Sequence, residues 1–101
     1  MNKQNLKVKI KEAIENNPFR KNIRRVSLFG SYLYGSPRTD SDVDLLIEFS
    51  PSAHIGLFGL MAIKEDVERY IGKQVDLLTP ESLSQYFKQN VLGQAETVYE
   101  G

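Results

Sequence analysis

The sequence predicts a small mixed α/β domain of the α+β type, with helices packed on a short mixed β-sheet. Apolar runs of strand length alternate with segments of helical periodicity, in the order α-β-α-β-α-β-α. With 101 residues, of which 41% are hydrophobic, the chain is expected to form one domain around a modest core. A single domain over residues 1–101 leaves little room for a separate substrate-binding domain.

The first half of the chain is predicted to form a helix followed by two strands. Apolar residues at helical spacing predict an amphipathic helix over about residues 4–16, which Pro18 ends. The apolar run that ends at residue 29 predicts the first strand, starting near residue 23. After the first strand we expect a Gly-Ser turn at Gly30 and a short helical turn to Gly35. A polar loop then leads to a second strand over residues 42–49.

The second half is predicted to add two helices and a third strand. A helix is expected over about residues 56–70, with Gly72 as its C-cap. Its predicted core stripe is Leu57, Leu60, Met61, Val67 and Ile71. Residues 74–79 predict the third strand, and a last helix is expected from Thr79 to about Leu92, with Pro in its first turn. The tail, residues 96–100, is either a short edge strand or a docked extension.

Composition excludes several classes of protein. The chain has no cysteine, so it has neither disulfides nor thiolate metal ligands. No run approaches the roughly 18 to 20 apolar residues of a membrane span, so we expect no membrane association and a cytoplasmic location. The formal net charge is zero, which predicts no direct nucleic-acid partner.

Charge is nevertheless distributed unevenly. Residues 1–30 hold eight Lys or Arg and two Glu, a net charge of +6, whereas residues 31–101 have a net charge of −6. Two interpretations of the basic cluster remain open: a solvated edge, or a group that offsets an acidic site or meets an acidic partner. The cluster consists of Arg20, Lys21, Arg24 and Arg25.

Three aspartates are the candidate catalytic groups. Asp42 and Asp44 share one face of the second strand, because side chains alternate along a strand. On that pair alone, the wet face of an antiparallel sheet is the favoured interpretation. Asp76 lies inside the third strand, and if the two strands are neighbours it could approach the pair to about 5 Å between Cβ atoms. Three converging carboxylates would need cations, and oxygen ligands favour Mg²⁺ or Mn²⁺.

The glycine turn suits a phosphate group. Gly30 can adopt a backbone conformation closed to other residues and allows close approach of a ligand. Ser31 can cap a helix or donate its hydroxyl to a phosphate oxygen, and Gly35 lets the chain return toward Asp42. Two metal ions about 3.5–4 Å apart beside such a turn would clamp the attacking and leaving oxygens of an in-line displacement.

These residues together resemble a known family. Gly30-Ser31, Gly35, Ser41-Asp42-x-Asp44 and the later Asp76 resemble the signature of the DNA polymerase β-like nucleotidyltransferase superfamily. The short length of the chain and the sequence around the motif are most similar to those of its minimal members. These are the MNT-domain antitoxins encoded beside HEPN-domain toxins. The resemblance covers nearly the whole chain and implies the polymerase β-like palm fold.

The resemblance also implies roles for the motif residues. The catalytic and metal-binding residues would be Asp42, Asp44 and Asp76, with Asp76 helping to deprotonate the acceptor. Gly30, Ser31, Gly35 and Ser41 would hold the nucleotide. The implied reaction transfers AMP from ATP to a tyrosine of the HEPN toxin, with two Mg²⁺ ions, and makes the chain the antitoxin of a type VII-like pair. Many members have Arg where this chain has Tyr34, and Arg38 could substitute.

Two rival functions remain open. The chain could neutralise a toxin by binding alone, or it could transfer a nucleotide to a small molecule. The second usually requires an additional substrate-binding domain in this superfamily. Among the other polar residues, His54 is expected to be a solvated loop residue, and Glu48 is expected to have a surface role.

Overall fold

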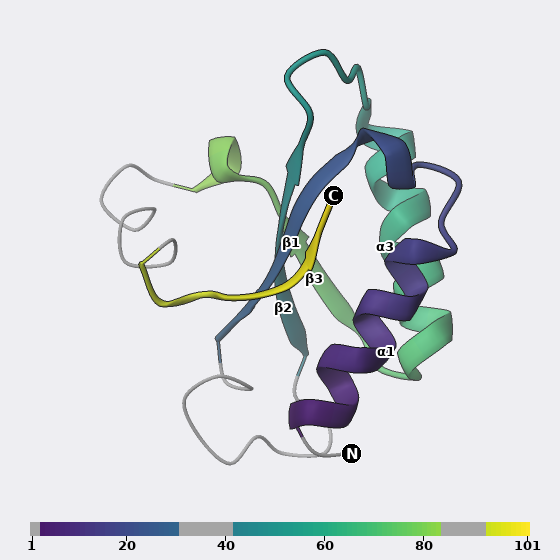
Figure 1. Cartoon of the computed structure of the whole chain (residues 1–101). Coiled ribbons are helices and arrows are strands. Elements are labelled where there is room, and N and C mark those ends of the chain that lie inside the picture. Colours follow the sequence, from purple (N-terminus) through teal and green to yellow (C-terminus); the bar gives the residue numbers. More distant parts are fainter. Residues whose placement is uncertain (1–2, 31–41, 84–92) are drawn as a thin grey trace.

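The computed structural model describes residues 3–30, 42–83 and 93–101, which form a mixed sheet with two helices on one face (Figure 1). The helices are α1 (Lys3–Glu15) and α3 (Leu57–Ile71). The strands are β1 (Ile23–Phe29), β2 (Val43–Phe49), β3 (Val75–Leu78) and β4 (Glu96–Glu100), and the 3₁₀ turns are η1 (Arg20–Asn22) and η2 (Pro80–Ser82). The predicted α/β class is therefore confirmed.

The strands are ordered β3-β2-β1-β4. β1 pairs in antiparallel fashion with both β2 and β4, whereas β2 and β3 run parallel. A parallel pair requires a crossover connection, and α3 provides it between β2 and β3. The tail thus forms an edge strand rather than a docked extension.

The core lies between the helices and one face of the sheet. Val43, Leu45 and Ile47 of β2 are fully buried there, as the alternation along the strand predicts. Leu46 faces the other way and is also fully buried. It packs in a second, smaller cluster with Phe29, Leu78, Leu83 and Ala95. The face opposite the helices is called the open face below.

The predicted core stripe of α3 is partly wrong. Leu57 and Met61 are 68% and 47% exposed, whereas Ile63, Val67 and Ile71 are buried. Leu60 is only partly buried against the core. The helix contains two overlapping apolar stripes, and the buried one is rotated away from Leu57 and Met61. The predicted C-cap is confirmed: Gly72 has φ +72°, and its N–H donates to Glu68 O at 2.8 Å.

The predicted continuous helix after Thr79 is also wrong at its start. Within residues 79–83 the chain forms the single turn η2, and Leu83 returns to an extended conformation with φ −89° and ψ 142°, whereas residues 93–94 are helical. Ser82 Oγ donates to Thr79 O at 2.7 Å and lies 3.2 Å from Thr79 N, which closes the turn on itself. Such local side-chain bonds compete with helix propagation. Residues 84–92 of the predicted helix lie outside the described residues.

Polar contacts fasten the helices to the rest of the fold. Lys3 and Lys7 Nζ lie 2.6 and 3.2 Å from the Glu96 carboxylate, joining α1 to β4. The pKa of Glu96 is lowered, chiefly by the hydrogen bond from Lys3. Asn17 is buried and donates to Asp66 Oδ2 at 2.9 Å, which joins the end of α1 to α3. Neither described helix has the length and apolar character that crossing a bilayer requires.

Candidate functional site

Asp44 lies in the middle of the sheet, between strands on both sides. Its register partners are Phe29 on β1 and Asp76 on β3. Asp42 immediately precedes β2. Asp44 is half-buried, whereas Asp42 and Asp76 are exposed. The condition that the second and third strands are neighbours is therefore met, and Asp76, on the edge strand β3 of the described sheet, is in register with Asp44.

The three carboxylates interact electrostatically. The pKa of Asp44 is raised above its ordinary value, first by burial and then by the negative charges of Asp76 and Asp42. Each of these effects disfavours the ionised form. A cation beside Asp44 would reverse the second effect, since an opposite charge favours the ionised carboxylate.

The backbone of Gly30 lies directly against the carboxylate of Asp44. Gly30 has φ +82°, a conformation that residues with a Cβ rarely adopt. A Cβ placed on this residue would overlap Asp44 Oδ2 and lie only 2.9 Å from Asp44 Cγ. Two independent constraints therefore require glycine here. The conformation of Gly30 was predictable from the sequence, but the contact with Asp44 was not, because it follows from the antiparallel pairing of β1 with β2.

A divalent cation fits this donor set by chemistry. The candidate ligands are hard carboxylate oxygens, and their mutual repulsion is what a cation would relieve. Within residues 3–30, 42–83 and 93–101, no three acidic, histidine or cysteine side chains converge closely enough to form a ready-made metal cage. The aspartates are thus neighbours whose negative charges interact.

Several predicted site residues cannot be placed. Ser31, Gly35 and Ser41 lie outside the described residues, and so do Tyr34 and Arg38. Their roles stay predictions from the sequence. Of the predicted nucleotide-binding residues, Gly30 is the one that the described structure brings to the aspartates.

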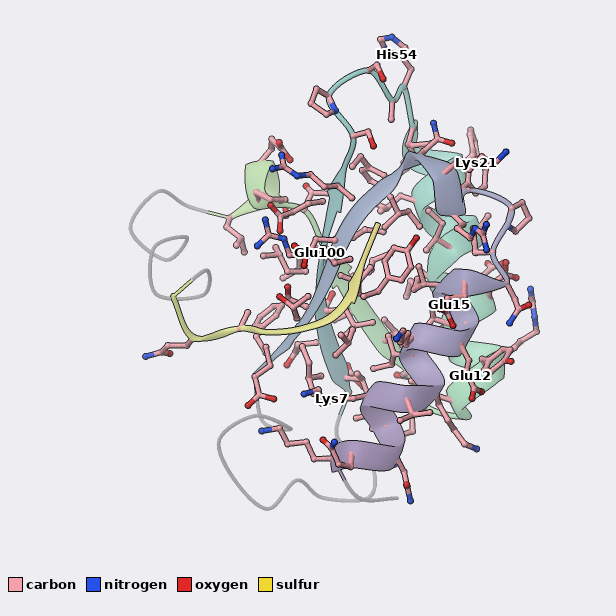
Figure 2. All side chains as sticks on the ribbon, viewed as in Figure 1. Lys7, Glu12, Glu15, Lys21, His54 and Glu100 are labelled. Atoms are coloured by element: carbon pink, nitrogen blue, oxygen red, sulfur yellow. The ribbon has the colours of Figure 1, made fainter. Side chains whose placement is uncertain are left out.

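The remaining polar candidates lie away from Asp44. His54 is exposed, and Figure 2 shows it at the tip of the β2–α3 loop, at the end of the molecule opposite the start of β2. This confirms the expected solvated loop residue. Glu48 shares the face of Asp44, but its Oε2 lies 3.2 Å from Arg25 Nε. Arg25 of the basic cluster therefore offsets Glu48 rather than the aspartates.

Known proteins resemble the chain over most of its length. A family model described as "Polymerase beta, Nucleotidyltransferase" matches residues 8–101. An inferred protein adenylyltransferase of Methanocaldococcus jannaschii is 36% identical over 75% of this chain and 80% of its own length. The protein adenylyltransferase MntA of Thermococcus cleftensis is 37% identical over 76% of this chain and 74% of its own length.

Solved structures share the fold. An inferred minimal nucleotidyltransferase superposes with a TM-score of 0.76 at 30% identity, covering 94% of both chains. A toxin–antitoxin structure with AMP-PNP has a TM-score of 0.73 at 22% identity, over 94% of this chain and 73% of that chain. A complex of tri-AMPylated Shewanella oneidensis HEPN toxin with MNT antitoxin has a TM-score of 0.68 at 20% identity, over 98% and 73%.

Proposed function

The chain belongs to the polymerase beta nucleotidyltransferase family, and we propose that it transfers AMP from ATP to a hydroxyl, expected to be a tyrosine, of a cognate HEPN-domain toxin. In this role it is an antitoxin. The observation that carries the proposal is the arrangement around Asp44, with the Gly30 backbone against its carboxylate and Asp76 in register beside it.

The related proteins support this choice of reaction. Two curated relatives above 30% identity are protein adenylyltransferases by name, and one fold neighbour is an antitoxin with its AMPylated HEPN toxin. The neighbour with AMP-PNP supports ATP as the donor. The toxin–antitoxin structures are 22% identical or less to this chain, so they show a shared fold and not a shared partner. The HEPN-domain partner of this chain is therefore part of our proposal.

The proposed chemistry divides among the chain's own residues. Asp42, Asp44 and Asp76 would hold divalent cations, with Mg²⁺ expected and Mn²⁺ an alternative; when bound, they neutralise charge on the phosphate oxygens. The missing Cβ of Gly30 leaves room for the Asp44 carboxylate, and Gly30 would hold the nucleotide together with Ser31, Gly35 and Ser41. Asp76 accepts the proton of the acceptor hydroxyl. The hydroxyl oxygen bonds to the α-phosphorus, the bond to pyrophosphate breaks, and AMP remains on the acceptor.

The test is transfer to the HEPN-domain protein that we expect to be encoded beside this chain. With ATP and Mg²⁺, intact-mass spectrometry should show one or more AMP units added to that protein. Asp42→Asn/Asp44→Asn and Asp76→Asn should each abolish the addition. Absence of any mass gain with a folded, active partner would refute the proposal, as would full transfer by the double variant.

Neutralisation by binding alone is distinguished in cells. If transfer is the basis of protection, the Asp42→Asn/Asp44→Asn variant should bind the toxin and yet fail to restore growth. Full protection by this variant would mean that masking is sufficient. Turnover of a small alcohol without any protein partner would instead favour the small-molecule reaction.

A further inference from the structure

A cavity of about 590 Å³ opens at the opposite end of β2 from Asp44. It is bounded by the start of β1, the end of β2 with the turn that follows, and the 3₁₀ turn η2. Its lining includes Arg24, Glu48, Ala53 and Glu81. Figure 1 shows η2 on the side of the sheet away from α1 and α3, which places the cavity along the open face.

The cavity and the aspartates lie along one face of one strand. Glu48 lines the cavity and is four residues beyond Asp44, so both side chains point to the open face. At 3.3 Å per residue the two positions are about 13 Å apart. Between them lies Leu46, which is fully buried in the apolar cluster with Phe29, Leu78, Leu83 and Ala95. A ligand engaging both ends would therefore cross this cluster.

The charges on the cavity walls are only partly satisfied. Glu48 is paired with Arg25. Arg24 and Glu81 are exposed, and within the part of the chain that the structure describes neither forms an ion pair. Arg24 lies on β1 and Glu81 lies on η2, which follows β3, so β2 lies between the strands that position the two residues. The cavity thus offers one positive and one negative group on opposite walls.

We propose that this cavity is a docking subsite for the protein that accepts the nucleotide. It would bind a segment with charges of both signs, its acidic side chain meeting Arg24 and its basic side chain meeting Glu81. An extended segment covers 13 Å in about four residues, so the docked residues lie about four positions from the acceptor hydroxyl. The inference rests on the proposed transfer to a protein and adds where that protein is recognised.

The chemistry of the walls favours a charged protein segment over the nucleotide base. An adenine ring is uncharged and is typically held by stacking on aromatic side chains. Phe49 is the aromatic residue that lines the cavity, and it packs against the hydrophobic core on the helix side. Opposite unpaired charges instead match the complementary charge patterns that fix register between proteins.

Charge reversal at Arg24 tests the proposal. Arg24→Glu should raise the KM for the acceptor protein roughly three- to tenfold and leave kcat and the KM for ATP unchanged. Glu81→Lys should act in the same direction. Lys21→Glu is the matched control, because it makes the same charge change on an exposed residue of η1 outside the cavity lining. Ala53→Phe, which fills the cavity without changing charge, should also raise the acceptor KM.

Two kinetic results would overturn the proposed docking subsite. A rise in the KM for ATP at Arg24→Glu would assign the cavity to the nucleotide. Equal increases in the acceptor KM for Lys21→Glu and Arg24→Glu would mean that long-range electrostatic attraction, and not docking in the cavity, causes the change. Titration calorimetry with the acceptor in the absence of ATP separates this inference from the reaction itself. If transfer fails but Arg24→Glu weakens binding, the docking subsite stands and the proposed function falls; unchanged binding and KM would refute the subsite.

Discussion

At the scale of single residues, the groups around Asp44 determine how easily its carboxyl ionises. A glycine backbone contacts its carboxylate on one side, and Asp76 is its register partner on the other. Burial and two negative neighbours raise its pKa. The carboxylate is therefore held in an unfavourable setting that a bound cation would improve.

Substituting Gly30 tests the close contact. Gly30→Ala combines the cost of a left-handed conformation with a collision against Asp44, whereas Gly72→Ala has a similar φ and no atom within 4 Å. We expect Gly72→Ala to lower the free energy of unfolding by about 1–2 kcal/mol, and Gly30→Ala to lower it by more. Urea denaturation of both variants measures the difference. Equal losses would mean that Asp44 does not press on Gly30.

The pH dependence of stability tests the setting of Asp44. Because its folded pKa lies above the unfolded value of 3.8, the native state binds more protons, so stability falls as pH rises through that window. Without divalent cations, Asp44→Asn should therefore be more stable than the wild type at pH 7. The advantage should vanish below pH 3.8, where the carboxyl is protonated in both states.

Added Mg²⁺ supplies the control for that comparison. A cation that binds only the native site should stabilise the wild type and leave Asp44→Asn nearly unchanged. Denaturation curves at pH 3 and pH 7, with and without Mg²⁺, report all of these effects. A variant less stable than the wild type by the same amount at both pH values would contradict the account.

Residue contacts in the site that depend on the pairing of strands could be predicted from the sequence only in part. The pairing of Asp44 with Asp76 was predictable only on the condition that their strands are neighbours, and the parallel register meets that condition. The contact between Gly30 and Asp44 was not predictable from spacing, because it is created by the pairing of two strands. Ser31, Gly35 and Ser41 keep the roles that the family resemblance suggests.

At the scale of elements, helix α3 shows why periodicity alone can mislead. Apolar residues occupy two overlapping stripes, and both satisfy the helical repeat. Contact with α1 and the sheet, which no local pattern encodes, decides that Ile63 is buried and Met61 exposed. The strand boundaries were easier to predict, since alternation in β2 marks the buried face directly.

Paired alanine substitutions in α3 test this assignment. Ile63→Ala should lower the free energy of unfolding by about 2–5 kcal/mol, because it leaves a cavity in the core. Met61→Ala should change it by no more than about 0.5 kcal/mol, as expected for an exposed side chain. Thermal or urea denaturation measures both. The reverse ranking would restore the stripe predicted from the sequence.

At the scale of the whole molecule, one face of the sheet forms the core and the other has the candidate functional groups. Both described helices cover one face and supply most of the core. The other face has the aspartates at one end of β2 and the cavity at the other. In our proposal this small domain presents a reaction site and a recognition site at the two ends of one strand, and an acceptor protein would supply the remaining surface.

The most direct measurement is the single-turnover rate of AMP transfer from labelled ATP to the HEPN-domain partner, for Asp44→Asn against Glu48→Gln. Both substitutions remove one carboxylate from the same face of β2, four residues apart. Asp44→Asn should slow transfer by on the order of 10²-fold or more, since a metal site contributes several kcal/mol. Glu48→Gln should leave the rate at saturating partner within about twofold. Equal losses in both variants, or an unchanged rate in Asp44→Asn, would contradict the account.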